Sequence, residues 1–165
     1  MKQEILIAII AASSALGGVI ISQVFSLLQS FYDKKYKKQI LLRQKYEEMM
    51  FHFSASLEWI VSLNGSTTQA SVFALAQCPD ARKALSLCLL YFSELAEPAN
   101  NYVLAQQSYY TVIITSFKED SSFTAGGQAV VKNKQKFDAA TKNLFSNKDI
   151  FENLIISNAK KYTKA

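Results

Sequence analysis

The feature that most constrains this chain is an apolar stretch near its N-terminus. Between Ile5 and Tyr32 there is no Asp, Glu, Lys, Arg or His. As a helix, Ile5–Leu28 would be about 36 Å long, and the hydrocarbon core of a bilayer is about 30 Å thick. Phe31 and Tyr32 follow where aromatic side chains favour the lipid–water interface. We therefore expect a transmembrane helix over residues 5–32, preceded by a short N-terminal tail, residues 1–4.

Two other interpretations of this segment stay open. Lys2 before an apolar run, with Ser13-Ser14-Ala15 behind it, is also the pattern of a cleaved signal peptide. The apolar run continues well past that position, and Glu4 offsets the charge of Lys2, which favours an anchor. The segment could also be a buried helix of a soluble protein, because its Ser and Gln residues make it less apolar than an average span.

Small residues recur every four positions in this segment, and such spacing lets a second helix approach closely. Gln23 adds a polar group that prefers a partner to lipid. We expect association here, either with a second copy or with the membrane helix of another protein; alternatively, this face simply meets lipid. The predicted packing residues are Ser14, Gly18, Ser22, Gln23, Ser26 and Ser30.

A basic cluster follows the apolar segment directly, and we expect it to bind the headgroups of anionic lipids. It consists of Lys34, Lys35, Lys37 and Lys38, in a chain of net charge +5. The positive-inside rule then puts the C-terminal domain in the cytoplasm and the N-terminus outside. The layout resembles that of many small bacterial proteins with an N-terminal anchor, so the expected location is a bacterial inner membrane.

The rest of the chain predicts an all-α fold in which the anchor helix runs on into a bundle of about four to five helices. Apolar residues at steps of three and four continue behind the lysines, and no Gly or Pro interrupts the chain between Gly18 and Gly65. We expect a basic juxtamembrane helix over residues 33–64, with the remainder of the bundle in residues 65–165. Its inward face would carry Leu42, Tyr46, Met49, Met50, Phe53, Leu57, Ile60 and Val61.

Local signals divide residues 65–165 into further helices. Ser66-Thr67-Thr68 can cap a short helix, and Pro79 suits the first turn of the next one. Glu97-Pro98 predicts a break, with another helix over residues 99–117. The run Tyr109–Thr115 is rich in strand-favouring residues, but it has no partner run, so we favour helix.

The C-terminal part predicts a loop and two more helices. Lys118–Gly127 is polar and ends in two glycines, which is typical of a loop. A helix over residues 128–145 would follow. Ser146-Asn147-Lys148-Asp149 has the pattern of a capping box and predicts the start of a last helix. Lysines make both helices basic, which we interpret as solvated faces rather than a nucleic-acid site, because no recognition motif accompanies them.

The sequence offers little chemistry. It holds one histidine, His52, and two cysteines, Cys78 and Cys88, which we expect to be free thiols, and this set is too small for a zinc site. Glu94 and Glu97 could share a helix face and act as an acid–base pair. No glycine-rich phosphate loop is present. We therefore expect no metal, no cofactor and no enzymatic activity.

Three functions are compatible with these features. The leading hypothesis is a membrane-anchored interaction or scaffold module that self-associates through its span and binds an unidentified protein partner. The second is a membrane-perturbing effector, such as a toxin or defence protein, because polar residues lie on the span. The third is an enzyme of unfamiliar type, which a deep polar pocket around His52 or the Glu94–Glu97 pair would support.

Overall fold

The computed structural model describes the backbone of residues 2–163, and within that range every regular element is a helix. The side chains of residues 2, 4–13, 15, 16 and 163 lie outside the description. Residues 2–41 and 42–163 belong to two compact units, each described by itself. The all-α prediction is confirmed. The helices are α1 (Lys2–Gly65), α2 (Gln69–Ala74), α3 (Pro79–Tyr91), α4 (Ser93–Ser116) and α5 (Ala125–Thr163).

Helix α1 includes the expected membrane helix and the expected juxtamembrane helix without an interruption between them. Its end at Gly65 agrees with the helix predicted over residues 33–64. Among the residues that the structure describes, no helix contains a stretch both long enough and apolar enough to cross a membrane. The first part of the expected span, residues 5–13 with 15 and 16, lies outside the described side chains.

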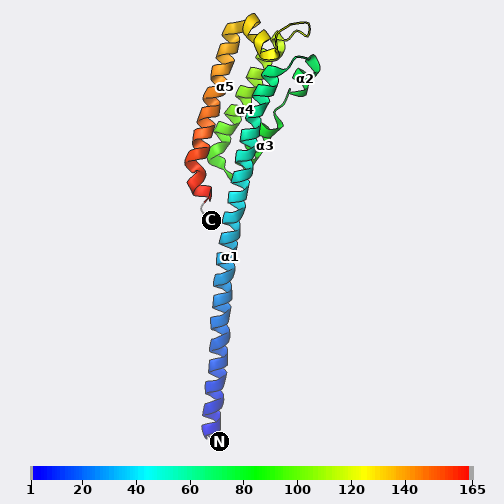
Figure 1. Ribbon diagram of the computed structural model, residues 1–165. Helices are drawn as coiled ribbons and strands as arrows, with labels where there is room; N and C mark the ends of the chain where they lie inside the picture. Colours follow the sequence, from blue (N-terminus) through cyan, green and yellow to red (C-terminus); the bar gives the residue numbers. More distant parts are fainter. Residues whose placement is uncertain (1, 164–165) are drawn as a thin grey trace. The chain divides into compact units, whose positions relative to one another are not determined.

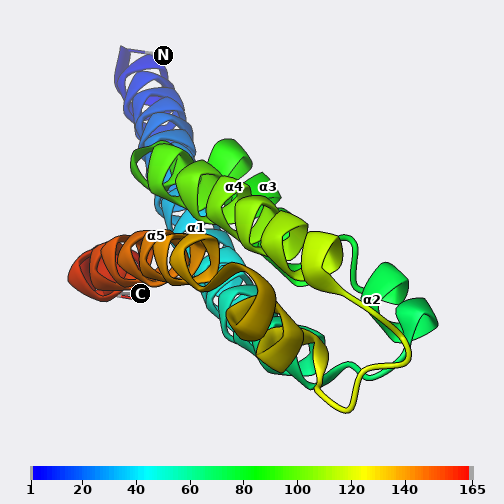
Figure 2. The same cartoon turned by 90° about the horizontal axis from the view of Figure 1, so that it is seen from above.

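The second unit is a bundle of the C-terminal part of α1 with α3, α4 and α5 (Figures 1 and 2). Two groups of three aromatic rings show how the helices run. Each group takes one ring from α1, one from α4 or the residue before it, and one from α5. The first aromatic trio is Tyr46, Phe92 and Tyr162, with ring centroids 4.8–5.2 Å apart; the second is Phe53, Tyr102 and Phe151, with centroids 5.1–6.1 Å apart.

The order of these rings fixes the direction of each helix. From the first trio to the second, residue numbers rise in α1 and α4 and fall in α5. Helix α4 is therefore parallel to this part of α1, and α5 is antiparallel to both. Helix α4 packs against both α3 and α5. Aromatic pairs in edge-to-face or offset-stacked contact add about 0.5–1.5 kcal/mol each beyond their buried area.

The predicted break at Glu97-Pro98 is wrong, because the chain breaks at Phe92 instead. Phe92 has φ −135° and ψ 66°, and α4 runs through Pro98 without ending. The Phe92 side chain is completely buried between Tyr46 and Tyr162. The chain therefore turns where this ring packs, and α4 continues through Pro98 although a proline beyond the first turn disfavours a helix. The run Tyr109–Thr115 lies inside α4, which excludes the strand.

The predicted helix start at Ser146 is also wrong, since α5 continues through it. Asn147 bonds within the helix to Asn143, and Lys148 pairs with Glu152 one turn on. Polar residues without Gly or Pro are tolerated inside a helix, so the capping pattern has no effect here. The irregular point in α5 is Asn133, with φ −140° and ψ 50°, whose side-chain amide donates to Ser116 Oγ at 3.0 Å.

The loop between α4 and α5 is shorter than predicted, because both glycines belong to α5. A Cβ built on Gly126 would lie 2.7 Å from Asn64 Oδ1, so a glycine is needed for close packing against the end of α1. The Gln128 side chain fixes the loop: its amide nitrogen donates to the carbonyls of Lys118 and Phe123, and its oxygen accepts from the Lys118 amide.

Two apolar residues that the spacing placed on the inward face of α1 are exposed, namely Met50 and Val61. Each is next to a residue that faces the core, since Met50 follows Met49 and Val61 follows Ile60. An apolar stripe read at steps of three and four is wider than the face that a neighbouring helix covers. The edges of such a stripe therefore remain in contact with solvent.

The position of Phe92 predicts a large stability loss on truncation. Phe92→Ala should lower the free energy of unfolding by about 3–5 kcal/mol, because it leaves a cavity between two other rings. Chemical denaturation of the full chain in detergent, followed by circular dichroism, measures this. Leu90→Ala is the control: Leu90 is 74% exposed, so its truncation should change stability by less than about 0.5 kcal/mol. Equal effects of the two variants would contradict the assigned core.

Candidate functional site

The first part of α1 exposes large apolar side chains in every direction around the helix. Phe25 is 67% exposed and Leu27 is 72% exposed, and none of the residues from 18 to 39 is buried. We call residues 18–32 the apolar segment. A helix that is apolar all round is normally buried in a large core or in a membrane. The exposed large residues are Val19, Ile20, Ile21, Val24, Phe25, Leu27, Leu28, Phe31 and Tyr32.

The predicted packing residues lie on a surface that no other part of the described chain covers. Ser14, Gly18, Ser22, Gln23, Ser26 and Ser30 are all exposed. In a regular helix each step of four residues turns by about 40°, so Ser14 and Ser30 differ by about 160°. The small residues therefore wind around the helix instead of forming one straight stripe. Any three in succession, such as Gly18, Ser22 and Ser26, still share one face.

The polar members of this set gather on one side. At about 100° per residue, Ser22, Gln23, Ser26 and Ser30 fall within an arc of about 100°. Gln29 lies at the edge of this arc, and the rest of the circumference at this level carries apolar side chains such as Leu27 and Leu28. The part of the apolar segment nearest the lysines thus has a polar face suited to hydrogen bonding with another helix.

The four predicted headgroup-binding lysines are exposed on the next turns of α1. Lys34, Lys35, Lys37 and Lys38 together cover an arc of about 160°, and Tyr32 and Tyr36 lie opposite them. Phe31 and Tyr32 are in edge contact, with centroids 6.3 Å apart. Lysines and aromatic rings therefore surround the helix directly after the apolar segment, which is the composition of a membrane interface.

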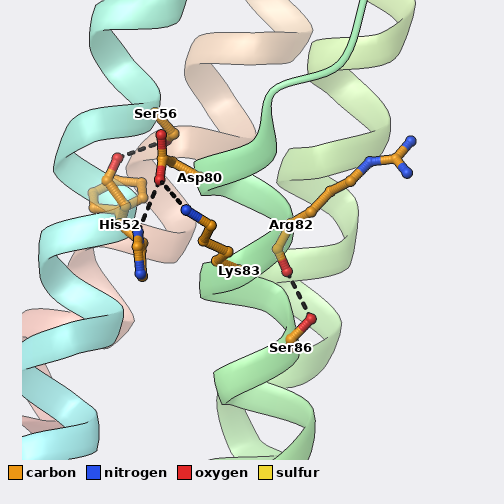
Figure 3. Close-up of polar contacts among 7 residues, drawn as sticks. His52, Ser56, Asp80, Arg82, Lys83 and Ser86 are labelled. Carbon is orange, nitrogen blue, oxygen red and sulfur yellow. Dashed lines mark hydrogen bonds and ion pairs between the residues drawn. The ribbon is translucent and has the colours of Figure 1, made fainter.

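His52 is held by a carboxylate from another helix (Figure 3). Its Nδ1 lies 2.9 Å from Asp80 Oδ1, and Lys83 Nζ lies 3.4 Å from the same oxygen. Asp80 is in the first turn of α3, where a negative charge is favourable. Figure 3 shows the Arg82 side chain pointing away from this group. The arrangement ties α3 to α1. Its members could not be paired from the sequence, because His52 and Asp80 are 28 residues apart.

Glu94 is likewise part of a contact between helices. Its carboxylate accepts hydrogen bonds from Lys161 Nζ and from the Tyr162 hydroxyl, and the Lys161 ammonium lies 4.9 Å from the centre of the Tyr162 ring. These bonds, that from Lys161 above all, lower the pKa of the Glu94 carboxyl to about 2. Glu94 therefore connects the end of α5 to the start of α4. These contacts explain the position of Glu94 without the acid–base pair expected between Glu94 and Glu97.

A chain of buried polar groups crosses the bundle between α1 and α4. Gln106 Nε2 donates to the Tyr102 hydroxyl at 2.9 Å, and Tyr102 lies 2.9 Å from Ser56 Oγ, which donates to the carbonyl of Phe53. Burial raises the pKa of Tyr102 to about 12, so it stays protonated and can donate. The four-residue spacing of Tyr102 and Gln106 is only a weak sequence signal for these contacts, since Ser56 lies on another helix.

Both cysteines are free, as predicted, and both are buried. Burial raises the pKa of the Cys78 thiol, and it raises that of Cys88 to about 12. Neither thiol is a thiolate near neutral pH, so neither has the reactivity of a nucleophile. Among the described residues, no group of three or more His, Cys, Asp or Glu side chains could hold a metal ion.

Comparison with known proteins adds no relative: no family model, no curated protein and no solved structure matches this chain. Its function must therefore be inferred from the exposed surface of α1 and the buried polar groups of the bundle. Of these, the polar groups of the bundle mostly bond to one another. The exposed apolar segment and the lysines behind it, in contrast, make no contact of this kind within the described chain.

The Glu94 contact predicts a specific pH dependence. Because the folded state lowers the pKa of Glu94, its contribution is complete above about pH 4.5 and is lost as the pH falls towards about 2. Glu94→Gln should cost about 1 kcal/mol at pH 7, a value kept small because Lys161 is well exposed. Urea denaturation at pH 7 and at pH 2 measures it. A cost that stays the same at both pH values would contradict this role.

Proposed function

We propose that this protein is a membrane-anchored helical interaction module. The apolar segment of α1 enters the bilayer, the lysines behind it contact anionic headgroups, and the bundle binds a protein partner in the cytoplasm. One observation supports this most strongly: large apolar side chains are exposed all round a helix that has no charged residue between Ile5 and Tyr32. Each apolar Å² left in water costs about 25 cal/mol, so a nonpolar environment is strongly favoured.

The lysines support the same placement. Each of Lys34, Lys35, Lys37 and Lys38 adds about 1 kcal/mol of attraction to an anionic leaflet when it lies near the surface. They outnumber the single Lys2 at the other end of the apolar stretch, which favours a cytoplasmic bundle. A soluble helical oligomer is a weaker explanation, because the exposed side chains cover the whole circumference and not one seam.

Self-association is the second part of the proposal. Gly18, Ser22 and Ser26 form the face on which a second copy of α1 would pack, at the right-handed crossing typical of small residues spaced by four. Gln23 and Ser30 lie beside this face and can bond across it. A Cβ at Gly18 would meet no other atom of its own chain within 4 Å. The glycine is therefore not required by the described fold, as expected for a residue that serves an intermolecular contact.

The anchor predicts how the protein partitions between membrane and solution. The full chain should stay in the pellet after alkaline carbonate extraction and ultracentrifugation. Ile20→Lys combined with Val24→Lys should move it to the supernatant, because each lysine near the middle of a span costs about 2.5–3.5 kcal/mol.

Val61→Lys is the matched control for this experiment. It makes the same change on the same helix at a residue that is 73% exposed and lies outside the expected span, so it should stay in the pellet. Release of the unmodified chain by carbonate would refute the anchor.

The packing face predicts a loss of crosslinking. Gly18→Leu should reduce the dimer band formed in membranes by an amine-reactive crosslinker by about tenfold, since the bulky side chain prevents close approach. Val24→Leu, which enlarges an exposed residue on the opposite side of the helix, should leave the band unchanged. Equal bands for both variants would mean that copies do not associate through this face.

A membrane-perturbing effector is the second candidate, and the polar arc of Ser22, Gln23, Ser26 and Ser30 favours it. Several copies that turn this arc towards a common axis would line a narrow polar path through the bilayer. Expression would then depolarise the membrane, and leucine at Ser22 and Ser26 would abolish the effect. An unchanged membrane potential on expression would leave the interaction module as the better proposal.

A further inference from the structure

A small cavity lies where α1, the linker before α3 and α4 meet. The centre of a water-sized sphere can occupy about 10 Å³ of this cavity. Its walls include Trp59, Cys78, Gln106 and Tyr110. By this measure about 10–15 Å³ accommodates one water molecule, provided that two to four polar groups surround it. The cavity is therefore of the right size for a single water and too small for an organic ligand.

Gln106 presents an unpartnered acceptor in the wall of this cavity. The residue is 2% exposed. Its Nε2 donates to the Tyr102 hydroxyl at 2.9 Å and to the carbonyl of Ser56 at 3.5 Å, and no donor in the described chain reaches its Oε1. The Ser56 carbonyl can only accept, so the amide nitrogen must face it. The orientation of the amide is thereby fixed, with Oε1 on the side left without a donor.

Tyr110 provides a second buried group of the same kind. Its hydroxyl is buried and has no hydrogen-bond partner in the described chain, although it lies one turn of α4 after Gln106. A buried polar group without a partner costs about 1–3 kcal/mol. Two such groups lining one cavity would be a large penalty for a bundle of this size, unless a single molecule satisfies both.

We propose that this cavity is a binding site for one structural water molecule, which donates to Gln106 Oε1 and accepts from the Tyr110 hydroxyl. Its second proton points towards the remaining polar wall, where the Cys78 sulfur is a weak acceptor. The water extends the buried chain of Ser56, Tyr102 and Gln106 to the linker. Trp59 Nε1 already holds that linker through the carbonyl of Leu75, at 2.9 Å.

Removal of the Tyr110 hydroxyl distinguishes a hydrated site from a dry one by the sign of its effect. With a water bound, Tyr110→Phe breaks a hydrogen bond and should lower the melting temperature of the full chain in detergent by about 2–4 °C. In a dry site the same change removes an unsatisfied hydroxyl, and the melting temperature would stay the same or rise. Tyr91→Phe makes the same change on an exposed ring and should cause no shift.

A crystal structure of the full chain tests the site directly. The expected result is a solvent peak within hydrogen-bond distance of both Gln106 Oε1 and the Tyr110 hydroxyl, weakened or lost in Tyr110→Phe. A cavity without such a peak, or a Tyr110→Phe variant as stable as the unmodified chain, would overturn the proposal. Neither outcome depends on whether α1 enters a membrane, because every group involved belongs to the bundle.

Discussion

The dominant physical constraint on this chain is the exposed apolar surface of the first part of α1. A helix can satisfy its own backbone hydrogen bonds, but it cannot hide side chains that point in every direction. Phe25 and Leu27 therefore need a nonpolar environment that the described chain does not supply. In our proposal a bilayer supplies it. The absence of charge from Ile5 to Tyr32, followed after Asp33 by four lysines, agrees with this proposal.

The bundle, by contrast, has a core of its own. The two aromatic trios join α1, α4 and α5, and most polar groups between the helices bond to one another. His52 is held by Asp80, and Glu94 by Lys161 and Tyr162, so these titratable groups support packing. The thiols are buried and protonated. Each of these groups therefore contributes to the packing of the bundle.

Much of the fold could be predicted from local signals. The end of α1 at Gly65, the Thr68 cap of α2 and the start of α3 at Pro79 follow from residues whose backbone preferences act on the spot. The break at Phe92 and the irregular Asn133 could not be predicted, because the cause of each lies on other helices. The capping pattern at Ser146 failed for the same reason: packing of Leu144 and Phe151 keeps α5 continuous through it.

The site could be predicted less well than the fold. Ser22 and the lysines after Asp33 were predicted from spacing and charge alone, since these features lie within one helix, and the structure shows that they are exposed. The partners of His52 and Glu94 could not be found, because each contact joins residues far apart in the sequence. The acceptor left free on Gln106 depends on where the Tyr102 hydroxyl and the Ser56 carbonyl lie, and no sequence pattern encodes this.

The central claim is that the apolar segment lies in hydrocarbon. Spin labels on single cysteines along α1, introduced after Cys78 and Cys88 are replaced by alanine, test it most directly in reconstituted bilayers. Labels at Ile20, Val24 and Leu28 should collide readily with oxygen and hardly at all with a water-soluble nickel complex, with the preference reversing by Lys38. Easy access of the nickel complex to all positions from Ile20 to Lys38 would contradict the claim.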